Sequence, residues 1–309
     1  MLETKETPTK GASDEKSVSI LLVLVMIIWG GNFVVLKFGL EQMSPAAFTA
    51  IRFAVSAPFF FILSRVFGIS LGIKREDYWK IFALGAVYTA FYQVLFATAV
   101  AYTTAGNSSL IMATAPLITA IMSYFIGYEK INIKAVLGIL LSFLGVFLVV
   151  RSTYTIGITA LSIKGDILAV FAVIFFASYA VYIKPLLQRY HFIHLLFYCS
   201  VIGGALLTLY SRSELSAAMA AGISLQTFLS LCYSIFGVTI FGFSFWYYGI
   251  SILGPSKTQV FMNLNPVVAV FAGVLVLNEA MTITKIVGLG LTIIGIEAAR
   301  RNIARIKVK

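Results

Sequence analysis

Long apolar runs separated by short polar stretches fill almost the whole chain after residue 17. Most of the runs are about 17 to 23 residues long, which lets a helix rising 1.5 Å per residue cross a ~30 Å hydrocarbon core. Lipid offers no partner for unpaired backbone groups, and porin-like alternation is absent, so the pattern predicts membrane-spanning helices. The ten predicted helices are 18–36, 46–66, 79–101, 108–128, 135–150, 167–183, 192–210, 228–250, 258–277 and 283–299.

A segment of the first half of the chain recurs in the second half. Residues 102–147 align with residues 252–297 at a constant shift of 150 positions. Apolar composition alone does not place prolines, acids and glycines in register. Each half holds five helices, an odd number, so the second copy must enter the membrane from the opposite side, as in the inverted repeats of many transporters. The matched pairs are Met112 and Met262, Pro116 and Pro266, Glu129 and Glu279, Ile133 and Ile283, Gly138 and Gly288, Leu141 and Leu291, and Gly145 and Gly295.

The predicted fold is therefore an all-α membrane protein with ten transmembrane helices in two five-helix inverted repeats. The first 17 residues are polar with mixed charge, which predicts a disordered cytoplasmic tail. The apolar stretch that follows has no cleavage site at its end, so it is expected to stay as the first helix. The expected domains are a tail (1–17), a first repeat (18–150), a connecting loop (151–165), a second repeat (166–299) and a basic cytoplasmic tail (300–309).

Composition agrees with a membrane protein, since 60% of the residues are hydrophobic, 11% are charged and the mean hydropathy is +0.97. The net charge of +11 would also suit a nucleic-acid-binding protein. The positions of the 23 lysines and arginines decide between these readings. With both termini in the cytoplasm, Arg52 lies inside a helix, 17 others lie on the inner side, and five lie on the outer side: Lys37, Arg151, Lys164, Arg212 and Lys285.

This asymmetry follows the positive-inside rule. It predicts a multi-pass protein of the cell membrane with both termini cytoplasmic, in contact with the lipid bilayer and with no nucleic-acid partner. The sequence leaves open whether the chain acts alone or as a homodimer.

Three sets of residues resemble one known family. They are the run Trp29-Gly30-Gly31-Asn32-Phe33, the pair Arg52-Phe53, and the twice-used pattern of proline, glutamate and two glycines. Together they resemble the EamA-type branch of the drug/metabolite transporter superfamily, over nearly the whole chain after the tail. The sixth predicted helix resembles a degenerate copy of the first, with Tyr179 opposite Asn32 and Lys184 opposite Lys37, but without the tryptophan.

The resemblance implies a carrier whose central cavity is lined chiefly by helices one, three, four, six, eight and nine. It implies small metabolites as substrates, often amino acids moved outward, while other relatives carry nucleotide sugars or triose phosphates. By the same analogy Asn32 and Tyr179 are candidate cavity residues, and the second helix, with Arg52, lies away from the cavity.

Polar side chains within spans are expensive, so they mark candidate substrate contacts. In the ninth predicted helix Ser256, Gln259, Asn263 and Pro266 share one helical face, and two amides offer both donors and acceptors to a polar substrate. The alternative is that these amides join neighbouring helices. The corresponding line in the fourth helix gives further candidates and a second proline: Ser109, Met112 and Pro116.

Aromatic residues supply the other candidates. Tyr88 and Tyr92 lie one turn apart in the third helix, and Trp246 lies in the eighth. We interpret them as cavity wall, with interfacial belt residues as the alternative. Pro116 and Pro266 each remove a helical hydrogen bond in mid-membrane, which suits a gating kink or a static bend.

Arg52 is the only basic residue well inside a span. It suits either a substrate carboxylate or a structural role, and the structural role is favoured.

None of the 12 acidic residues falls in the middle of a predicted helix, so exchange or uniport is favoured over proton coupling. A polyphosphate would need several cavity cations, so the substrates expected are small neutral or zwitterionic, partly apolar metabolites. Carriers of nucleotide sugars or phosphorylated metabolites are the alternative. No HExxH or GxSxG motif occurs, so an intramembrane enzyme is disfavoured, and no cofactor or metal is expected. A channel or a sensor is the third possibility.

Overall fold

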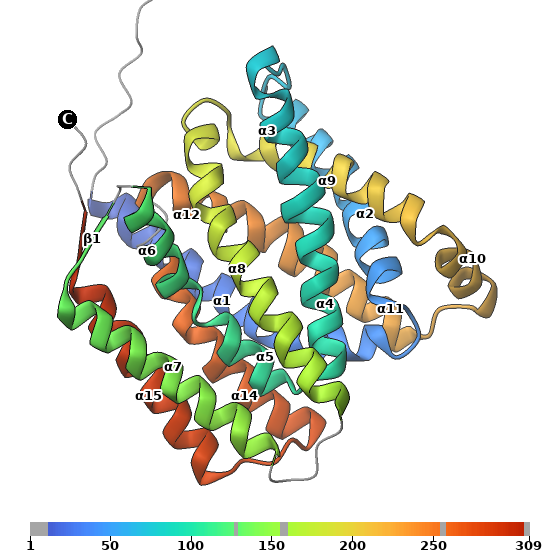
Figure 1. Cartoon of the computed structure of the whole chain (residues 1–309). Helices are drawn as coiled ribbons and strands as arrows, with labels where there is room; N and C mark the ends of the chain where they lie inside the picture. Colours follow the sequence, from blue (N-terminus) through green and yellow to red (C-terminus); the bar gives the residue numbers. More distant parts are fainter. Residues whose placement is uncertain (1–11, 127–128, 155–159, 254–257, 306–309) are drawn as a thin grey trace, which may run out of the picture.

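The computed structural model describes residues 12–126, 129–154, 160–253 and 258–305, and almost all of them are helical (Figure 1). The first repeat begins with α1 (Ala12–Leu40) and α2 (Pro45–Val66). Its third span is built from four consecutive segments: η1 (Arg75–Asp77), α3 (Tyr78–Ala83), η2 (Leu84–Phe91) and α4 (Tyr92–Tyr102). The fourth span divides into α5 (Ala105–Met112) and α6 (Ala115–Phe125), and the fifth is α7 (Ile133–Tyr154).

The second repeat begins with α8 (Ala160–Leu187) and α9 (Phe192–Tyr210). The short helix α10 (Arg212–Ala221) follows, and Figure 1 shows it at the edge of the bundle. The eighth span joins α11 (Leu225–Cys232), η3 (Tyr233–Phe243) and α12 (Ser244–Leu253). The ninth holds η4 (Val260–Asn263) and α14 (Leu264–Leu277), and the tenth is α15 (Ile283–Arg301).

The predicted fold class is confirmed: the chain is an all-α membrane protein of ten spans in two inverted five-helix repeats. Seven helical segments have the length and apolar composition of full spans, and Ile133–Leu148 and Phe261–Leu277 are shorter apolar helices. The predicted loop 151–165 is mostly helical, because α7 continues to Tyr154 and α8 starts at Ala160. Residues 12–17 of the predicted disordered tail instead form the start of α1, and the rest of the tail falls outside the described residues. A small antiparallel ribbon also joins β1 (Glu129–Ile131) to β2 (Ile303–Arg305).

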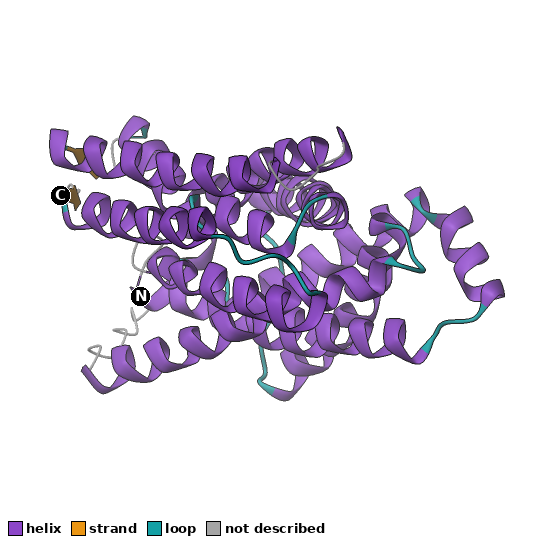
Figure 2. Ribbon diagram, turned by 90° about the horizontal axis from the view of Figure 1, so that it is seen from below, coloured by secondary structure: helices purple, strands orange, loops and turns teal. Residues whose placement is uncertain are grey.

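Helices α7 and α15 lie side by side at one edge of the bundle (Figures 1 and 2). Their glycines let the two backbones touch: a Cβ on Gly138 would lie 2.5 Å from the amide nitrogen of Ala299, and one on Gly145 would lie 2.5 Å from the carbonyl oxygen of Gly288. Such small residues permit close helix packing in a bilayer, where the hydrophobic effect does not drive helices together. Gly138 and Gly145 are repeated as Gly288 and Gly295, so the pair is built from the same residues in both repeats.

Spans three and eight each contain a π-helical segment beside the bundle core, η2 and η3. In η2 the hydroxyl of Thr89 donates to the carbonyl of Leu84 at 3.1 Å, and in η3 that of Thr239 donates to Ser234 at 2.9 Å. Both pairs span five residues, the spacing of a π-helix, and they match at the 150-residue shift. Such segments are rare and are frequently found at functional sites.

Candidate functional site

A cavity lies in the middle of the bundle, where the two repeats meet. Every residue in its wall is at most 9% exposed, so the surrounding helices enclose it. It leaves about 40 Å³ for the centres of water-sized molecules, room for a few waters. Its wall consists of Trp29, Asn32, Phe33, Arg52, Tyr92, Gln93, Phe96, Met112, Phe176, Val238, Phe243, Met262 and Asn265.

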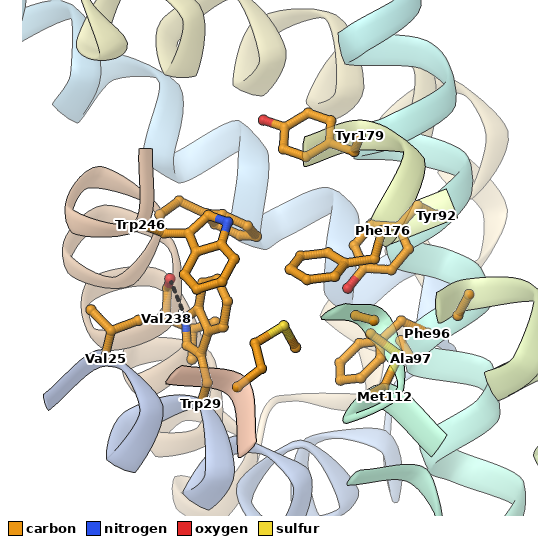
Figure 3. Packing of buried hydrophobic residues seen from close by; sticks show 14 of the residues in the cluster. Val25, Trp29, Tyr92, Phe96, Ala97, Met112, Phe176, Tyr179, Val238 and Trp246 are labelled. Carbon is orange, nitrogen blue, oxygen red and sulfur yellow. Dashed lines mark hydrogen bonds between the residues drawn. The ribbon is translucent and has the colours of Figure 1, made fainter. Parts of the chain in front are cut away.

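Aromatic rings make most of the wall. In Figure 3, Trp29 on α1 faces Tyr92 and Phe176 across the cavity. The Trp29 ring packs 5.2 Å from Phe243 and 5.2 Å from Trp246, and Tyr92 packs 5.6 Å from Phe176, centroid to centroid. These separations are typical of favourable aromatic pairs.

Trp29 also makes a polar contact with η3. Its indole Nε1–H donates to the carbonyl of Val238 at 3.3 Å. This carbonyl belongs to the π-helical segment, so the indole occupies an acceptor that a regular helix would use internally. The contact attaches the first span of one repeat to the eighth span of the other.

Arg52 on α2 supplies the positive charge of the cavity. The residue is 2% exposed, and its Nε donates to the hydroxyl of Thr239 at 2.5 Å. Its Nη1 donates to Oε1 of Gln93 at 3.3 Å, and the guanidinium lies 5.1 Å from the Phe53 ring centroid and 5.8 Å from that of Phe243. All of these partners are neutral, and none of the described wall residues carries a carboxylate.

Three amide side chains complete the polar part of the wall. Gln93 accepts from Arg52, as above, and Oδ1 of Asn32 accepts from the hydroxyl of Ser234 at 3.1 Å. Oδ1 of Asn265 is buried and has no hydrogen-bond partner among the described residues. A buried acceptor without a partner costs free energy, so it needs an explanation in terms of function or bound solvent.

A second, smaller space of about 20 Å³ adjoins the first and shares Tyr92, Gln93, Phe176 and Phe243 with it. Tyr88 and Tyr179 form part of its wall, with ring centroids 5.4 Å apart. The other lining residues come from α2, η2, α9 and α12: Phe53, Thr89, Leu196, Cys199, Ser200 and Tyr247.

The predicted site residues fall into two groups. Asn32, Tyr92 and Met112 line the central cavity, and Tyr88 and Tyr179 line the adjoining space. The others do not line either space: Ser109, Trp246, Gln259 and Asn263. Ser256, which shared their predicted face, lies outside the described residues.

The ninth span explains why its predicted face does not meet the cavity. Residues Val260–Asn263 form a 3₁₀ helix, which turns 120° per residue where an α-helix turns 100°. The single face predicted for Gln259, Asn263 and Pro266 is therefore broken. Met262 and Asn265 line the cavity in place of Gln259 and Asn263.

Several predicted site residues have a buried polar atom without a hydrogen-bond partner among the described residues. Gln259 donates from Nε2 to Thr119 at 3.2 Å, but its Oε1 has no partner among the described residues. The same holds for Oδ1 of Asn263, the hydroxyl of Tyr179 and the Nε1–H of Trp246. Ser109 differs, because its hydroxyl donates to the carbonyl of Gly106 at 2.8 Å.

Both prolines lie where a span is interrupted. Pro116 occupies the first turn of α6, directly after the break that separates α6 from α5. Pro266 is the third residue of α14, directly after η4. In both positions proline is tolerated because the amides of a first helical turn have no helical acceptor.

Polar contacts tie the helices together at the two ends of the bundle. At one end Glu279 accepts from the amides of Ala105 at 2.7 Å and Gly106 at 3.3 Å. Its carboxylate thus meets the N-terminus of α5 in the other repeat, where the helix dipole stabilises it. The side chain of Glu129 lies outside the described part of the chain.

At the opposite end Asp77 is fully buried and joins the third span to the connection between α8 and α9. It accepts from Lys80 at 2.8 Å, from Arg189 at 3.1 Å and from the hydroxyl of Tyr190 at 2.9 Å. The hydrogen bond and the negative charge of Asp77 raise the pKa of Arg189, which lies outside the membrane spans. Among the described residues no group of three His, Cys, Asp or Glu could hold a metal ion.

Ten spans in two inverted repeats around an enclosed cavity define the class of membrane transporters. Comparison with known proteins is more specific. The EamA-like transporter family matches residues 16–151 and 163–298, and the chain belongs to this family.

Two similar proteins bear the name uncharacterized transporter. One is from Archaeoglobus fulgidus and is 30% identical over 90% of this chain and 96% of its own. The other is YyaM of Bacillus subtilis, 28% identical over 92% of this chain and 93% of its own. A third, from Salmonella typhimurium, bears the name probable amino-acid metabolite efflux pump and is 27% identical over 89% of this chain and 92% of its own. A solved crystal structure matches the fold with a TM-score of 0.65 at 16% identity, over 92% of this chain and 96% of that one.

Proposed function

We propose that this protein is a carrier that moves small zwitterionic or amphipathic metabolites, amino acids among them, outward across the cell membrane. The observation that carries the proposal is the enclosed cavity between the two repeats, with one guanidinium, three amides and a mostly aromatic wall. The name of the Salmonella relative points to the same substrates. In this proposal both termini are cytoplasmic, the protein is not an enzyme, and nucleic acid is not a partner.

The mechanism proposed is alternating access. The present cavity holds only a few waters, so a metabolite needs the helices to separate on one side before it can enter. Every wall residue is nearly buried, which is the arrangement expected between the inward-open and outward-open states. The interrupted spans at Pro116 and Pro266 are the proposed gating points.

Several predicted residues keep their proposed roles as substrate contacts. Asn32, Tyr92 and Met112 would meet the substrate in the central cavity, and Tyr88 and Tyr179 on its way past the adjoining space. Gln259 and Asn263 have buried carbonyl oxygens without partners in the described part of the chain, so they would meet it when the ninth span moves. Trp246 would act through Trp29, against which it packs, and Ser109 through the backbone of α5.

Counterflow in proteoliposomes tests the proposal. Vesicles containing the purified protein are loaded with each amino acid, purine or sugar in turn, and uptake of the labelled compound is followed. A carrier gives saturable uptake that internal substrate accelerates. Absence of counterflow for every compound would refute the proposal, whereas unsaturable flux without acceleration would indicate a channel. Counterflow of nucleotide sugars or sugar phosphates alone would favour the alternative substrates.

A further inference from the structure

The charge of Arg52 is unusual for its position. A cation inside a membrane-spanning helix is expensive and generally has an anionic or carbonyl partner. Arg52 is 2% exposed, its hydrogen bonds go to Thr239 and Gln93, and neither partner is charged. The ion pairs seen among the described residues join other groups, at the ends of the bundle.

The location of Arg52 favours a role in binding over a purely structural role. A structural arginine would place its guanidinium against helix-end carbonyls or extend it towards the membrane surface. Arg52 instead forms part of the wall of the enclosed cavity, on a helix that resemblance alone places elsewhere. Thr239 and Gln93 hold two of its nitrogens, which fixes the direction of the planar guanidinium.

The same cavity offers acceptors for a positive group. Among the residues that the structure describes, Oδ1 of Asn265 is buried without a partner, and Oδ1 of Asn32 accepts one bond, from Ser234. An amide oxygen has room for two hydrogen bonds, so these two atoms can receive an ammonium group. The remaining wall is apolar and aromatic, including Trp29, Phe176 and Phe243.

We propose that the cavity recognises an amino acid as a zwitterion: Arg52 binds its carboxylate, Asn265 and Asn32 accept from its ammonium group, and the aromatic wall receives an apolar side chain. This assignment rests on the proposed carrier function and specifies its substrate class. A single guanidinium matches a single carboxylate in charge and bidentate geometry, whereas a phosphate dianion would keep an uncompensated charge in the cavity.

The first experiment changes the substrate and keeps the wild-type protein. Counterflow is measured for the amino acid that gives the highest rate, in competition with its decarboxylated amine and with its deaminated acid. Each analogue lacks one charged group but keeps the apolar side chain. Both are expected to compete at least ~30-fold more weakly than the amino acid, since a desolvated charged contact is lost. An amine that competes as well as the amino acid would overturn the proposal.

The second experiment changes the protein. In Arg52→Gln, counterflow of the amino acid is expected to fall at least ~30-fold, and the preference over the amine to disappear. Arg65→Gln is the matched control, because Arg65 lies exposed near the other end of α2. It is expected to behave as wild type. Arg52→Lys, which keeps the charge but not the bidentate fork, is expected to fall between the two.

The outcomes separate this proposal from the carrier function. Counterflow by the wild type without discrimination against the amine leaves the carrier in place and refutes the zwitterion site. An Arg52→Gln protein that keeps the full preference for the amino acid refutes it too. No counterflow of any amino acid in the wild type refutes both. If Arg52→Gln does not fold, the analogue series on the wild type still decides.

Discussion

The two halves of the central site differ in chemistry although they share one frame, the packed helices whose residues recur in both repeats. An offset of 147 positions aligns the start of α1 and α2 with α8 and α9, and it pairs Asn32 with Tyr179 and Arg52 with Cys199 as counterparts. Both halves rest on a π-helical segment held by a threonine, Thr239 beside Arg52 and Thr89 in the wall of the space with Cys199. The repeated residues build the frame, and the charge stands on one side only.

This difference suggests how a duplicated protein acquires specificity. Two identical halves would give a symmetric cavity with two cations or none, and two buried like charges would repel each other. With Arg52 in the wall of the central cavity and its counterpart Cys199 in the wall of the adjoining space, the site is charged in one half and neutral in the other. Substitutions that disturb the frame should therefore damage both halves, whereas substitutions at the mismatched positions should change only one.

The largest loss of stability is expected from a substitution in the shared frame, where α7 packs against α15. In Gly145→Leu, the new side chain would enter the backbone of α15 at Gly288, so α7 and α15 would have to separate. Overpacking of this kind should cost about 3 kcal/mol or more. Gly290→Leu is the control, because a Cβ on Gly290 meets nothing within 4 Å. Thermal unfolding in detergent should show a much lower Tm for Gly145→Leu only; equal values would mean that the contact does not hold the frame.

A smaller, unequal effect is expected from the two threonines. Thr89→Val and Thr239→Val each remove one hydroxyl and keep the shape. Thr89→Val loses the bond to Leu84, at a cost of about 1 kcal/mol. Thr239→Val also leaves the buried Nε of Arg52 without its acceptor, at a cost of about 2–3 kcal/mol in all.

Urea or thermal unfolding of the two threonine variants measures this difference, and counterflow shows its consequence. Transport should fall more in Thr239→Val than in Thr89→Val. If Thr89→Val is the more damaging substitution, the side of the cavity that carries recognition has been assigned wrongly.

The smallest effect on stability is expected from two helix caps, Ser44 and His191, which are counterparts at the offset of 147 positions. Ser44 caps α2 by accepting from Ala47 N–H, and Nδ1 of His191 caps α9 by accepting from Ile193 N–H at 3.3 Å. Partial burial and the neighbouring His194 lower the pKa of His191 below its ordinary value of 6.5. The unfolded chain therefore binds the proton more readily, so the contribution of His191 to stability is present above pH 6.5 and is lost as the pH falls below it.

The loss should be at most that of one helix cap, about 1 kcal/mol. Unfolding of the wild type and of His191→Ser between pH 7.5 and pH 5.5 measures it, since serine caps without titrating. The wild type should lose more stability than the variant on acidification. Parallel pH profiles would show that the imidazole is not an effective cap.

Sequence alone predicts much of the fold because membrane constraints are simple. Apolar length marks the spans, and an odd number of spans per repeat requires inversion. Asn32, Tyr92 and Met112 line the central cavity, and their role in binding stays a prediction, as do the boundaries of the repeats.

The rest of the cavity wall depends on departures from the α-helix that the sequence pattern does not predict. The 3₁₀ turn of η4 brings Asn265 to the cavity in place of Asn263. The π-helical turn of η3 places Thr239 and Val238 where they meet Arg52 and Trp29. A periodicity of 3.6 residues cannot predict either phase change. The sequence favoured a structural role for Arg52 for another reason, since the family resemblance placed the second helix away from the cavity.

The central claim is that the cavity opens to the two sides of the membrane in turn. The most direct test is whether a reagent added from either side reaches Met112 and Met262, the two repeat-related methionines in the cavity wall. Single cysteines at these positions, in a protein without Cys199 and Cys232, are treated with an impermeant thiol reagent from either side of oriented vesicles. Alternating access predicts that each cysteine reacts from both sides, and that substrate present on one side shifts the reaction between them. Reaction from one side only, whatever the substrate, would contradict a cavity that opens to both sides in turn.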